Sequence, residues 1–121
     1  MSRPFSGSGG ANYVGVHDLA GSVSWYKDKF GLREIDIEVD ESEGCVALGF
    51  SNEEYVLELG PTGKPTDELR PLLFASNIKK AREFLVSRGA SPGPIERDAQ
   101  GTQFFEIKDR EGNVVEVSEE P

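Results

Sequence analysis

The sequence is poor in positive charge, histidine and cysteine, and each shortage excludes a class of function. Its 121 residues carry 13 Lys and Arg against 22 Asp and Glu, which gives a formal net charge of −9. Nucleic-acid binding needs a basic face that displaces counterions from phosphates, so we expect no nucleic-acid partner. The single cysteine, Cys45, cannot form an internal disulfide, and no histidine or basic cluster next to it activates a catalytic thiol.

Long apolar runs are also missing. No stretch approaches the roughly 18 apolar residues of a membrane-spanning helix, and the N-terminus shows no apolar signal core. The Gly-rich segment SGSGG follows no predicted strand, so it does not match a phosphate-binding loop. We therefore expect a cytoplasmic protein without a membrane partner, with a length suited to one domain.

The first half of the chain predicts one helix and several strands. Residues 1–10 are rich in Ser and Gly and predict a flexible tail. The amphipathic stretch Leu19–Phe30 lies between Asp18, a typical N-cap, and Gly31, a typical C-terminal stop, and so predicts a helix. The predicted strands of this half are Asn12–Val16, Glu34–Val39, Cys45–Phe50 and Tyr55–Leu59.

The second half predicts the same order of elements after a linker rich in Pro and Gly at residues 61–68. Asn77 is the predicted N-cap of a helix over Ile78–Arg88, which Gly89 ends. The predicted strands of this half are Arg70–Ala75, Pro92–Arg97, Gln103–Lys108 and Asn113–Ser118.

An internal repeat relates the two halves. Asn77 follows Asp18 by 59 positions (77 − 18), and Leu57-Glu58-Leu59 matches Val115-Glu116-Val117 at an offset of 58 (116 − 58). Each half is a βαβββ module that is too small to bury its sheet alone, so two modules must share a core. We therefore predict an α+β fold in one structural domain. The expected module boundaries are 11–60 and 69–121.

Two segments of the chain resemble a known superfamily. VHDLAGSVSWYKDKFGL and FFEIKDREGNVVEV are similar to the two signature segments of the vicinal oxygen chelate superfamily, which includes glyoxalase I, extradiol dioxygenases and the fosfomycin- and bleomycin-resistance proteins. The similarity covers Asn12 to Val117. It implies that the tandem modules form an open cavity of curved sheets, and that two chains complete it in a homodimer.

The resemblance also implies where a metal would bind. Metalloenzymes of the superfamily take ligands from the first and last strands of each module, which correspond here to Ala11, Glu58, Arg70 and Glu116. The two carboxylates match this pattern, but a methyl group and a guanidinium stand at the other two positions, and Arg cannot lose its proton to bind a cation. The only histidine, His17, is six residues from Ala11 (17 − 11), or roughly 20 Å along a strand, and cannot replace a ligand. We therefore prefer no cofactor, with a divalent metal on Glu58 and Glu116 as the alternative.

Without a metal, Glu58, Arg70 and Glu116 have two interpretations. Arg70 can bridge the two carboxylates in a buried structural cluster that fills a former metal site. Alternatively, the same cluster orients a polar group of a ligand, or one Glu acts as a base. Strand phase places further side chains on the same concave face, where they form either ordinary core or a partly aromatic cavity suited to a flat or apolar ligand. They are Tyr13, Val56, Leu72 and Phe74.

These features favour a metal-independent binder of a small hydrophobic or cationic molecule over an enzyme. Such a binder is similar to the bleomycin-resistance branch and sequesters a drug or metabolite, and an acidic rim draws in cations. The alternative is a metal-dependent lyase, isomerase or dioxygenase-like enzyme that uses Glu58 and Glu116.

Overall fold

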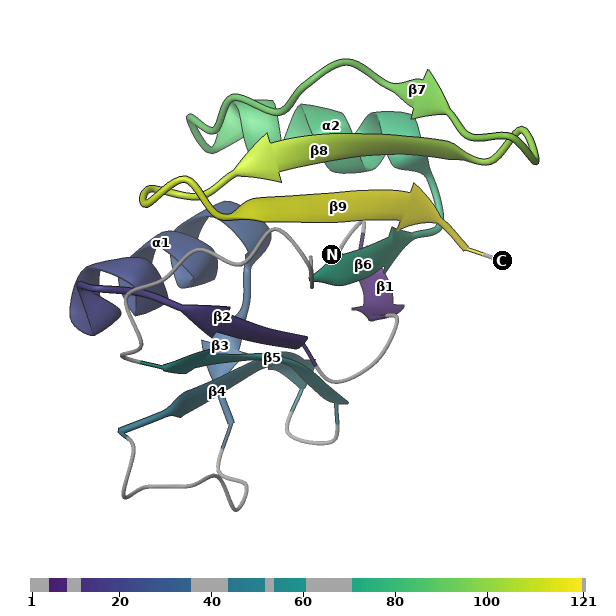
Figure 1. Ribbon diagram of the computed structural model, residues 1–121. Coiled ribbons are helices and arrows are strands. Elements are labelled where there is room, and N and C mark those ends of the chain that lie inside the picture. The colour runs from purple at the N-terminus through teal and green to yellow at the C-terminus, as the bar shows by residue number, and fades with distance from the viewer. Residues whose placement is uncertain (1–4, 9–11, 36–43, 52–53, 61–70, 121) are drawn as a thin grey trace.

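The computed structural model describes residues 5–8, 12–35, 44–51, 54–60 and 71–120. Two helices and nine strands are assigned in this part of the chain (Figure 1). They are β1 (Phe5–Ser8), β2 (Asn12–Gly15), α1 (Leu19–Phe30), β3 (Arg33–Glu34), β4 (Val46–Ser51), β5 (Glu54–Gly60), β6 (Leu72–Ala75), α2 (Ile78–Ser87), β7 (Glu96–Arg97), β8 (Gln103–Lys108) and β9 (Val114–Glu119). No helix within these ranges is long and apolar enough to cross a membrane.

The strands form two sheets, one for each module. The first sheet has the order β2-β5-β4-β3, and the second has the order β1-β6-β9-β8-β7. In each module the first strand runs parallel to the last one, and the remaining pairs are antiparallel. This topology confirms the predicted α+β fold with two βαβββ modules in tandem.

The strand register preserves the internal repeat. Tyr13 on β2 lies opposite Glu58 on β5, and Leu72 on β6 lies opposite Glu116 on β9. Tyr13 and Leu72 are 59 positions apart (72 − 13), and the two glutamates are 58 apart (116 − 58). Residues that the sequence repeat relates therefore occupy equivalent positions in the two modules.

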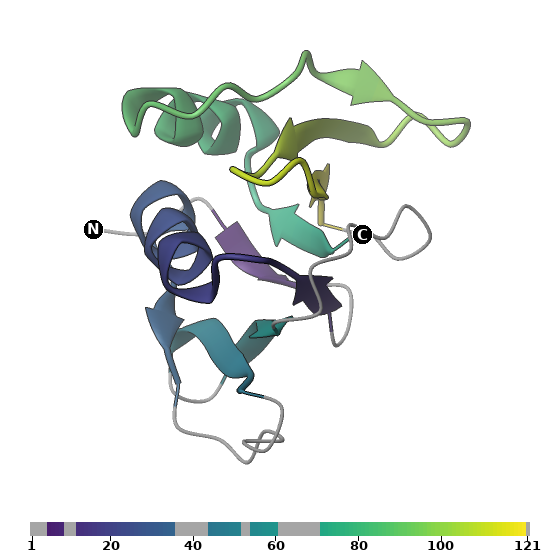
Figure 2. The same ribbon diagram turned by 60° about the vertical axis from the view of Figure 1, so that its left-hand side comes forward.

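Residues 1–10 were expected to be a flexible tail, and this is wrong for β1, which pairs antiparallel with β6. Phe5 of β1 is only 5% exposed. Its ring centroid lies 5.2 Å from that of Phe30, 5.7 Å from that of Phe50 and 5.8 Å from that of Phe84. These rings belong to α1, β4 and α2, so Phe5 fills the junction between the modules, where Figure 2 shows β1 in purple.

Both helices begin as their caps predict. The Asp18 carboxylate accepts a hydrogen bond from the backbone N–H of Gly21 at 3.0 Å, and the Asn77 side chain accepts one from Lys80 at 3.1 Å. Gly31 ends α1 with a φ of 72°, a conformation that favours glycine. The bounds of α1 match the prediction, and α2 ends one residue earlier than predicted.

The helix-facing side chains of both sheets form one continuous core. Leu57 and Leu59 on β5 and Val115 and Val117 on β9 are fully buried, as alternation along a strand requires. The cluster that they join spans both modules. The two modules therefore share a core, as the small size of each one predicts.

The predicted strand Pro92–Arg97 is much shorter than expected. The segment Pro92–Arg97 forms a strand only at β7, because Pro92 and Pro94 have no N–H for a sheet ladder. The Arg82 guanidinium binds the carbonyl oxygens of Pro92 and Gly93 at 3.1 and 2.8 Å. Of the predicted strand Glu34–Val39, Glu34 belongs to β3 and Ile35 follows it outside the strand, and residues 36–39, like the 61–68 linker, lie outside the described residues.

Candidate functional site

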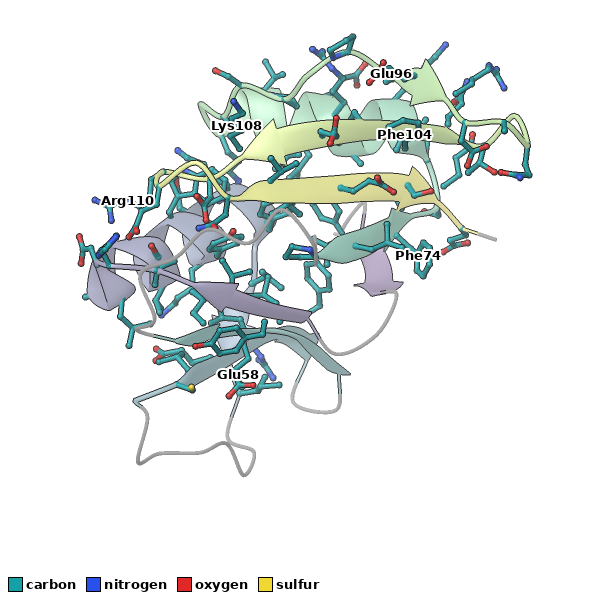
Figure 3. The ribbon with its side chains drawn as sticks, in the orientation of Figure 1. Glu58, Phe74, Glu96, Phe104, Lys108 and Arg110 are labelled. Atoms are coloured by element: carbon teal, nitrogen blue, oxygen red, sulfur yellow. The ribbon has the colours of Figure 1, made fainter. Side chains whose placement is uncertain are left out.

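The second sheet carries a row of two aromatic rings on the face opposite α2. Phe74 on β6 and Phe104 on β8 both lie opposite Ser118 on the central strand β9. Figure 3 labels both phenylalanines on their strands. The two rings are partly exposed, whereas the adjacent Phe105 is fully buried in the core. We call Phe74, Ser118 and Phe104 the aromatic row.

Two carboxylates lie in the next row of the same face. Glu116 on β9 lies opposite both Leu72 on β6 and Glu106 on β8. Directly opposed side chains on neighbouring strands have Cβ atoms about 5 Å apart, so Glu106 and Glu116 lie side by side on this face. We call Leu72, Glu116 and Glu106 the acidic row.

A hollow of about 620 Å³ adjoins the acidic row at the β8 side. Glu106 contributes to its wall together with Lys108 and Val114, which lie opposite each other one row further along. Ser91 and Gly93 close the hollow from the segment between α2 and β7. A small molecule on the acidic row therefore has room to extend in this direction.

The first sheet carries the other predicted carboxylate. Glu58 on β5 lies opposite Tyr13 on β2 and Ala47 on β4 (Figure 3). Tyr13 is 36% exposed, and its ring and hydroxyl occupy the space into which a side chain at Gly60 would project. The open face of this sheet is therefore filled at Gly60 by one of its own side chains.

The structure brings some of the predicted site residues together and separates others. Tyr13 and Glu58 are neighbours in the first sheet, whereas Leu72, Phe74 and Glu116 lie in the second. No ladder joins the two sheets among the described strands, and β1 lies at the edge of the second sheet, beside β6. Ala11, Arg70 and the side chain of Val56 lie outside the described residues, so the cluster of Glu58, Arg70 and Glu116 stays a prediction.

Sequence reasoning did not select Phe104, Glu106 or Ser118 as site residues. Phe104 and Phe105 are adjacent on one strand and therefore face opposite ways, but the sequence does not say which of them faces the core. Glu106 and Phe104 are two residues apart on β8 and so lie on the same face of the sheet, and this spacing was the signal that the sequence offered. The sequence does not say which set of alternate positions on β8 faces the helix.

The described donors do not fit a divalent metal. Catalytic sites for such ions offer three or four protein ligands. No three His, Cys, Asp or Glu side chains lie together in a way that could hold a metal within the described ranges. The strand neighbours of Glu58 are Tyr13 and Ala47, and Glu116 gains one further carboxylate from Glu106.

The turn between β8 and β9 joins the second module to the start of α1. The Glu111 carboxylate accepts hydrogen bonds from the backbone N–H groups of His17 at 2.7 Å and Asp18 at 2.8 Å. These two bonds hold the pKa of Glu111 below its ordinary value. Arg110 donates to the Asp18 carboxylate at 2.9 Å. The Glu111 side chain of the second module thus accepts hydrogen bonds from the backbone N–H groups that precede α1 in the first module.

A buried hydrogen bond supports the same turn. The hydroxyl of Tyr26, on the inner face of α1, donates to Asp109 at 2.8 Å, and Asn113 also donates to this carboxylate at 3.0 Å. Burial raises the pKa of Tyr26 well above its ordinary value, and the nearby Asp109 charge adds to the effect. The Asn113 side chain also reaches the carbonyl oxygen of Gly15 at 3.4 Å. The turn therefore fixes the end of β2, the strand that carries Tyr13.

Comparison with known proteins agrees with this architecture. The family model for the Glyoxalase/Bleomycin resistance protein/Dioxygenase superfamily matches residues 11–117. A glyoxalase/bleomycin resistance protein from Catenulispora acidiphila has a TM-score of 0.69 at 16% identity, over 92% of this chain and 96% of that one. An integron cassette protein from the mobile metagenome of a Halifax Harbour sewage outfall has a TM-score of 0.73 at 18% identity, over 91% and 96%.

A lactoylglutathione lyase from Agrobacterium tumefaciens has a TM-score of 0.65 at 17% identity, over 90% of each chain. At these identities the structural likeness shows the fold. None of the proteins with curated descriptions matches the chain. Because the family model covers nearly the whole chain, the protein belongs to the Glyoxalase/Bleomycin resistance protein/Dioxygenase superfamily.

Proposed function

We propose that the protein is a metal-independent binder that sequesters a small hydrophobic or cationic molecule. The observation that carries this proposal is the aromatic row beside the acidic row on one open sheet face. Partly exposed rings offer a flat ligand a large apolar contact, and nearby carboxylates offer a cation a charged partner. The net charge of −9 adds a long-range attraction for cations.

The residue types at the family's ligand positions also support binding without a metal. Ala11 and Arg70 offer a methyl group and a guanidinium where a metal site needs donors. The competing function is a metal-dependent lyase, isomerase or dioxygenase that uses Glu58 and Glu116. The fold alone does not separate the two, because one fold can serve many activities.

We also propose that the protein functions as a homodimer. The resemblance of the two signature segments implies that two chains complete the open cavity. Sedimentation velocity at several protein concentrations tests the proposal, because a monomer at all concentrations would contradict it.

A ligand screen with charge-matched compounds tests the function. Purified protein is screened by thermal shift against aromatic cations, neutral aromatics and aromatic anions, and the best compounds are titrated by calorimetry. We expect cations to stabilise the protein most. Glu116→Gln should weaken a bound cation roughly tenfold, because a hydrogen bond to a charged group is lost. Glu83→Gln, an exposed change on α2, is the matched control and should leave the affinity unchanged.

A metal titration tests the competing enzyme. Tight stoichiometric binding of nickel, manganese or zinc that disappears in the double variant Glu58→Gln/Glu116→Gln would overturn the metal-independent proposal. Heats indistinguishable from dilution in the original protein would support it.

A further inference from the structure

We propose that a groove along α1 is a separate binding site, which takes a small uncharged aliphatic molecule. The groove has a volume of about 730 Å³, within the range of sites for small molecules. It lies beside α1, whereas the proposed function concerns the open sheet faces, so the two can be tested separately. We call it the α1 groove, and its apolar wall consists of Leu19, Ala20, Val23 and Val46.

The wall of the α1 groove is aliphatic. Leu19, Ala20 and Val23 lie in the first two turns of α1, and Val46 begins β4. Leu19, Val23 and Val46 pack against the buried core and are themselves partly exposed. Among the described residues no aromatic ring lines the groove, so its contacts suit an alkyl chain rather than a flat ring.

The internal repeat explains why this place is open in the first module. Val23 corresponds to Arg82, because 82 − 23 gives 59, and Val46 corresponds to Phe105, because 105 − 46 gives 59. Val46 and Phe105 lie opposite equivalent residues of β5 and β9, which agrees with this assignment. At both positions the second module carries the larger side chain.

Arg82 fills the equivalent place in the second module. Its guanidinium donates to the carbonyl oxygens of Gly93 at 2.8 Å and Pro92 at 3.1 Å. Pro92 corresponds to Glu34, because 92 − 34 gives 58 and the residue after each donates its N–H to an equivalent carbonyl of the next strand. Arg82 thus bridges its helix to this segment, whereas the shorter Val23 leaves the groove beside Glu34 open.

The charged side chains at the rim of the α1 groove bind one another. The Lys27 ammonium lies 3.2 Å from the Glu34 carboxylate. Arg88 donates to the backbone carbonyl of Asp28 at 3.1 Å and lies 4.0 Å from its carboxylate. Two positive and two negative groups leave this rim without a net charge. A charged ligand would lose its water there without gaining a net counter-charge, so the groove favours an uncharged one.

A series of straight-chain alcohols tests the inference, because only the length of the apolar chain changes. Butan-1-ol, hexan-1-ol and octan-1-ol are titrated, and binding is followed by backbone amide shifts in two-dimensional NMR. We expect the affinity to rise about tenfold for every two added carbon atoms, because each buried methylene group contributes to binding. The largest shifts should fall at Ala20, Val23 and Val46.

Hexanoate and hexylammonium test the preference for an uncharged ligand. They have the chain length of hexan-1-ol and carry opposite charges. Both should bind more weakly than hexan-1-ol, because the charges of the rim are paired with each other.

Two variants close the α1 groove. Val23→Arg gives the first module the arginine that the second has at the equivalent position, and should weaken hexan-1-ol at least about tenfold. Ala20→Gln, at an exposed position, should also weaken it and decides the test if Val23→Arg does not fold. Val86→Arg makes the same exchange on α2, where Val86 is 50% exposed, and should leave the affinity unchanged.

Three results would overturn the inference: equal affinities along the alcohol series, tighter binding of either ion than of hexan-1-ol, or normal binding by folded Val23→Arg. Alcohol shifts confined to Phe74 and Phe104 would also overturn it and would support the proposed function. If no alcohol binds, this inference fails, and the ligand screen decides the proposed function independently.

Discussion

At the scale of single residues, Glu111 links the two modules through its charge. Its carboxylate oxygens accept hydrogen bonds from His17 and Asp18, and Ser22 adds its hydroxyl at 3.3 Å. All three donors belong to the segment that begins α1, whereas Glu111 follows β8. Asp18 caps α1 locally, and Glu111, 93 positions further along the chain (111 − 18), binds the backbone N–H groups of the N-cap and of the residue before it.

The charge of Glu111 should make this link sensitive to acid. Hydrogen bonds from His17 and Asp18 hold the pKa of Glu111 below its ordinary value of 4.5. Stability from a carboxylate with a lowered folded pKa is present above pH 4.5 and is lost as the pH falls through the folded value. We expect Glu111→Gln to lower the free energy of unfolding near neutral pH by about 1 kcal/mol, the net contribution of one hydrogen bond. Below pH 4.5 the difference should shrink.

Urea unfolding of both proteins between pH 3 and pH 7 measures this effect. Glu120→Gln, an exposed change near the C-terminus, serves as the control and should leave the curve unchanged. Parallel curves for the original protein and Glu111→Gln across the whole range would contradict the prediction.

At the scale of elements, β1 is the part whose role differs most from its composition. Ser and Gly dominate its neighbourhood, but Phe5 lies among rings of both helices and of β4. The burial of Phe5 and the hydrogen-bonded ladder with β6 together offset the loss of backbone freedom in this short segment.

Phe5→Ala should therefore destabilise the protein strongly. Replacing a buried Phe by Ala costs about 3–5 kcal/mol, from lost burial and from the cavity that is left. Phe5→Leu should cost clearly less, because it retains most of the apolar volume. Chemical denaturation of both variants measures the difference. A loss below about 1 kcal/mol for Phe5→Ala would show that β1 does not contribute to the core.

At the scale of the whole molecule, contacts between the two modules join them into one folding unit. The buried cluster crosses from one module to the other. Both ends of α1 contact the second module: its start binds Glu111, and at its end the Lys29 ammonium donates to the carbonyl oxygen of Arg88 at 2.7 Å. The two modules thus share a buried apolar core and are also joined by hydrogen bonds.

We expect the protein to unfold in a single cooperative transition. Trp25, the only tryptophan, lies on α1 and reports on the first module, whereas far-ultraviolet circular dichroism reports on both modules. Because the core is shared, the two signals should have the same midpoint and slope in denaturant. Fluorescence that changes at a clearly different denaturant concentration from the dichroism would show that the modules unfold separately.

The sequence by itself determined the features that depend on near neighbours along the chain. Asp18 and Gly31 bound α1 because capping involves residues within one turn, and the bounds of the helix follow from them. The offset of 58 to 59 residues revealed the two modules, and the signature segments indicated the superfamily. Strand alternation also placed Leu72 and Phe74 on one face with Glu116.

Only the tertiary structure decided the features that depend on pairing between distant strands. Phe104 and Phe105 are adjacent and chemically alike, and the register of β8 on β9 decides which of them lies on the open face. β1 became a strand because β6 offered a free edge and both helices offered a place for Phe5. The position of the Tyr13 ring over Gly60 depends likewise on the pairing of neighbouring strands. Local sequence does not encode such register, because a shift of one residue exchanges the two faces of a strand.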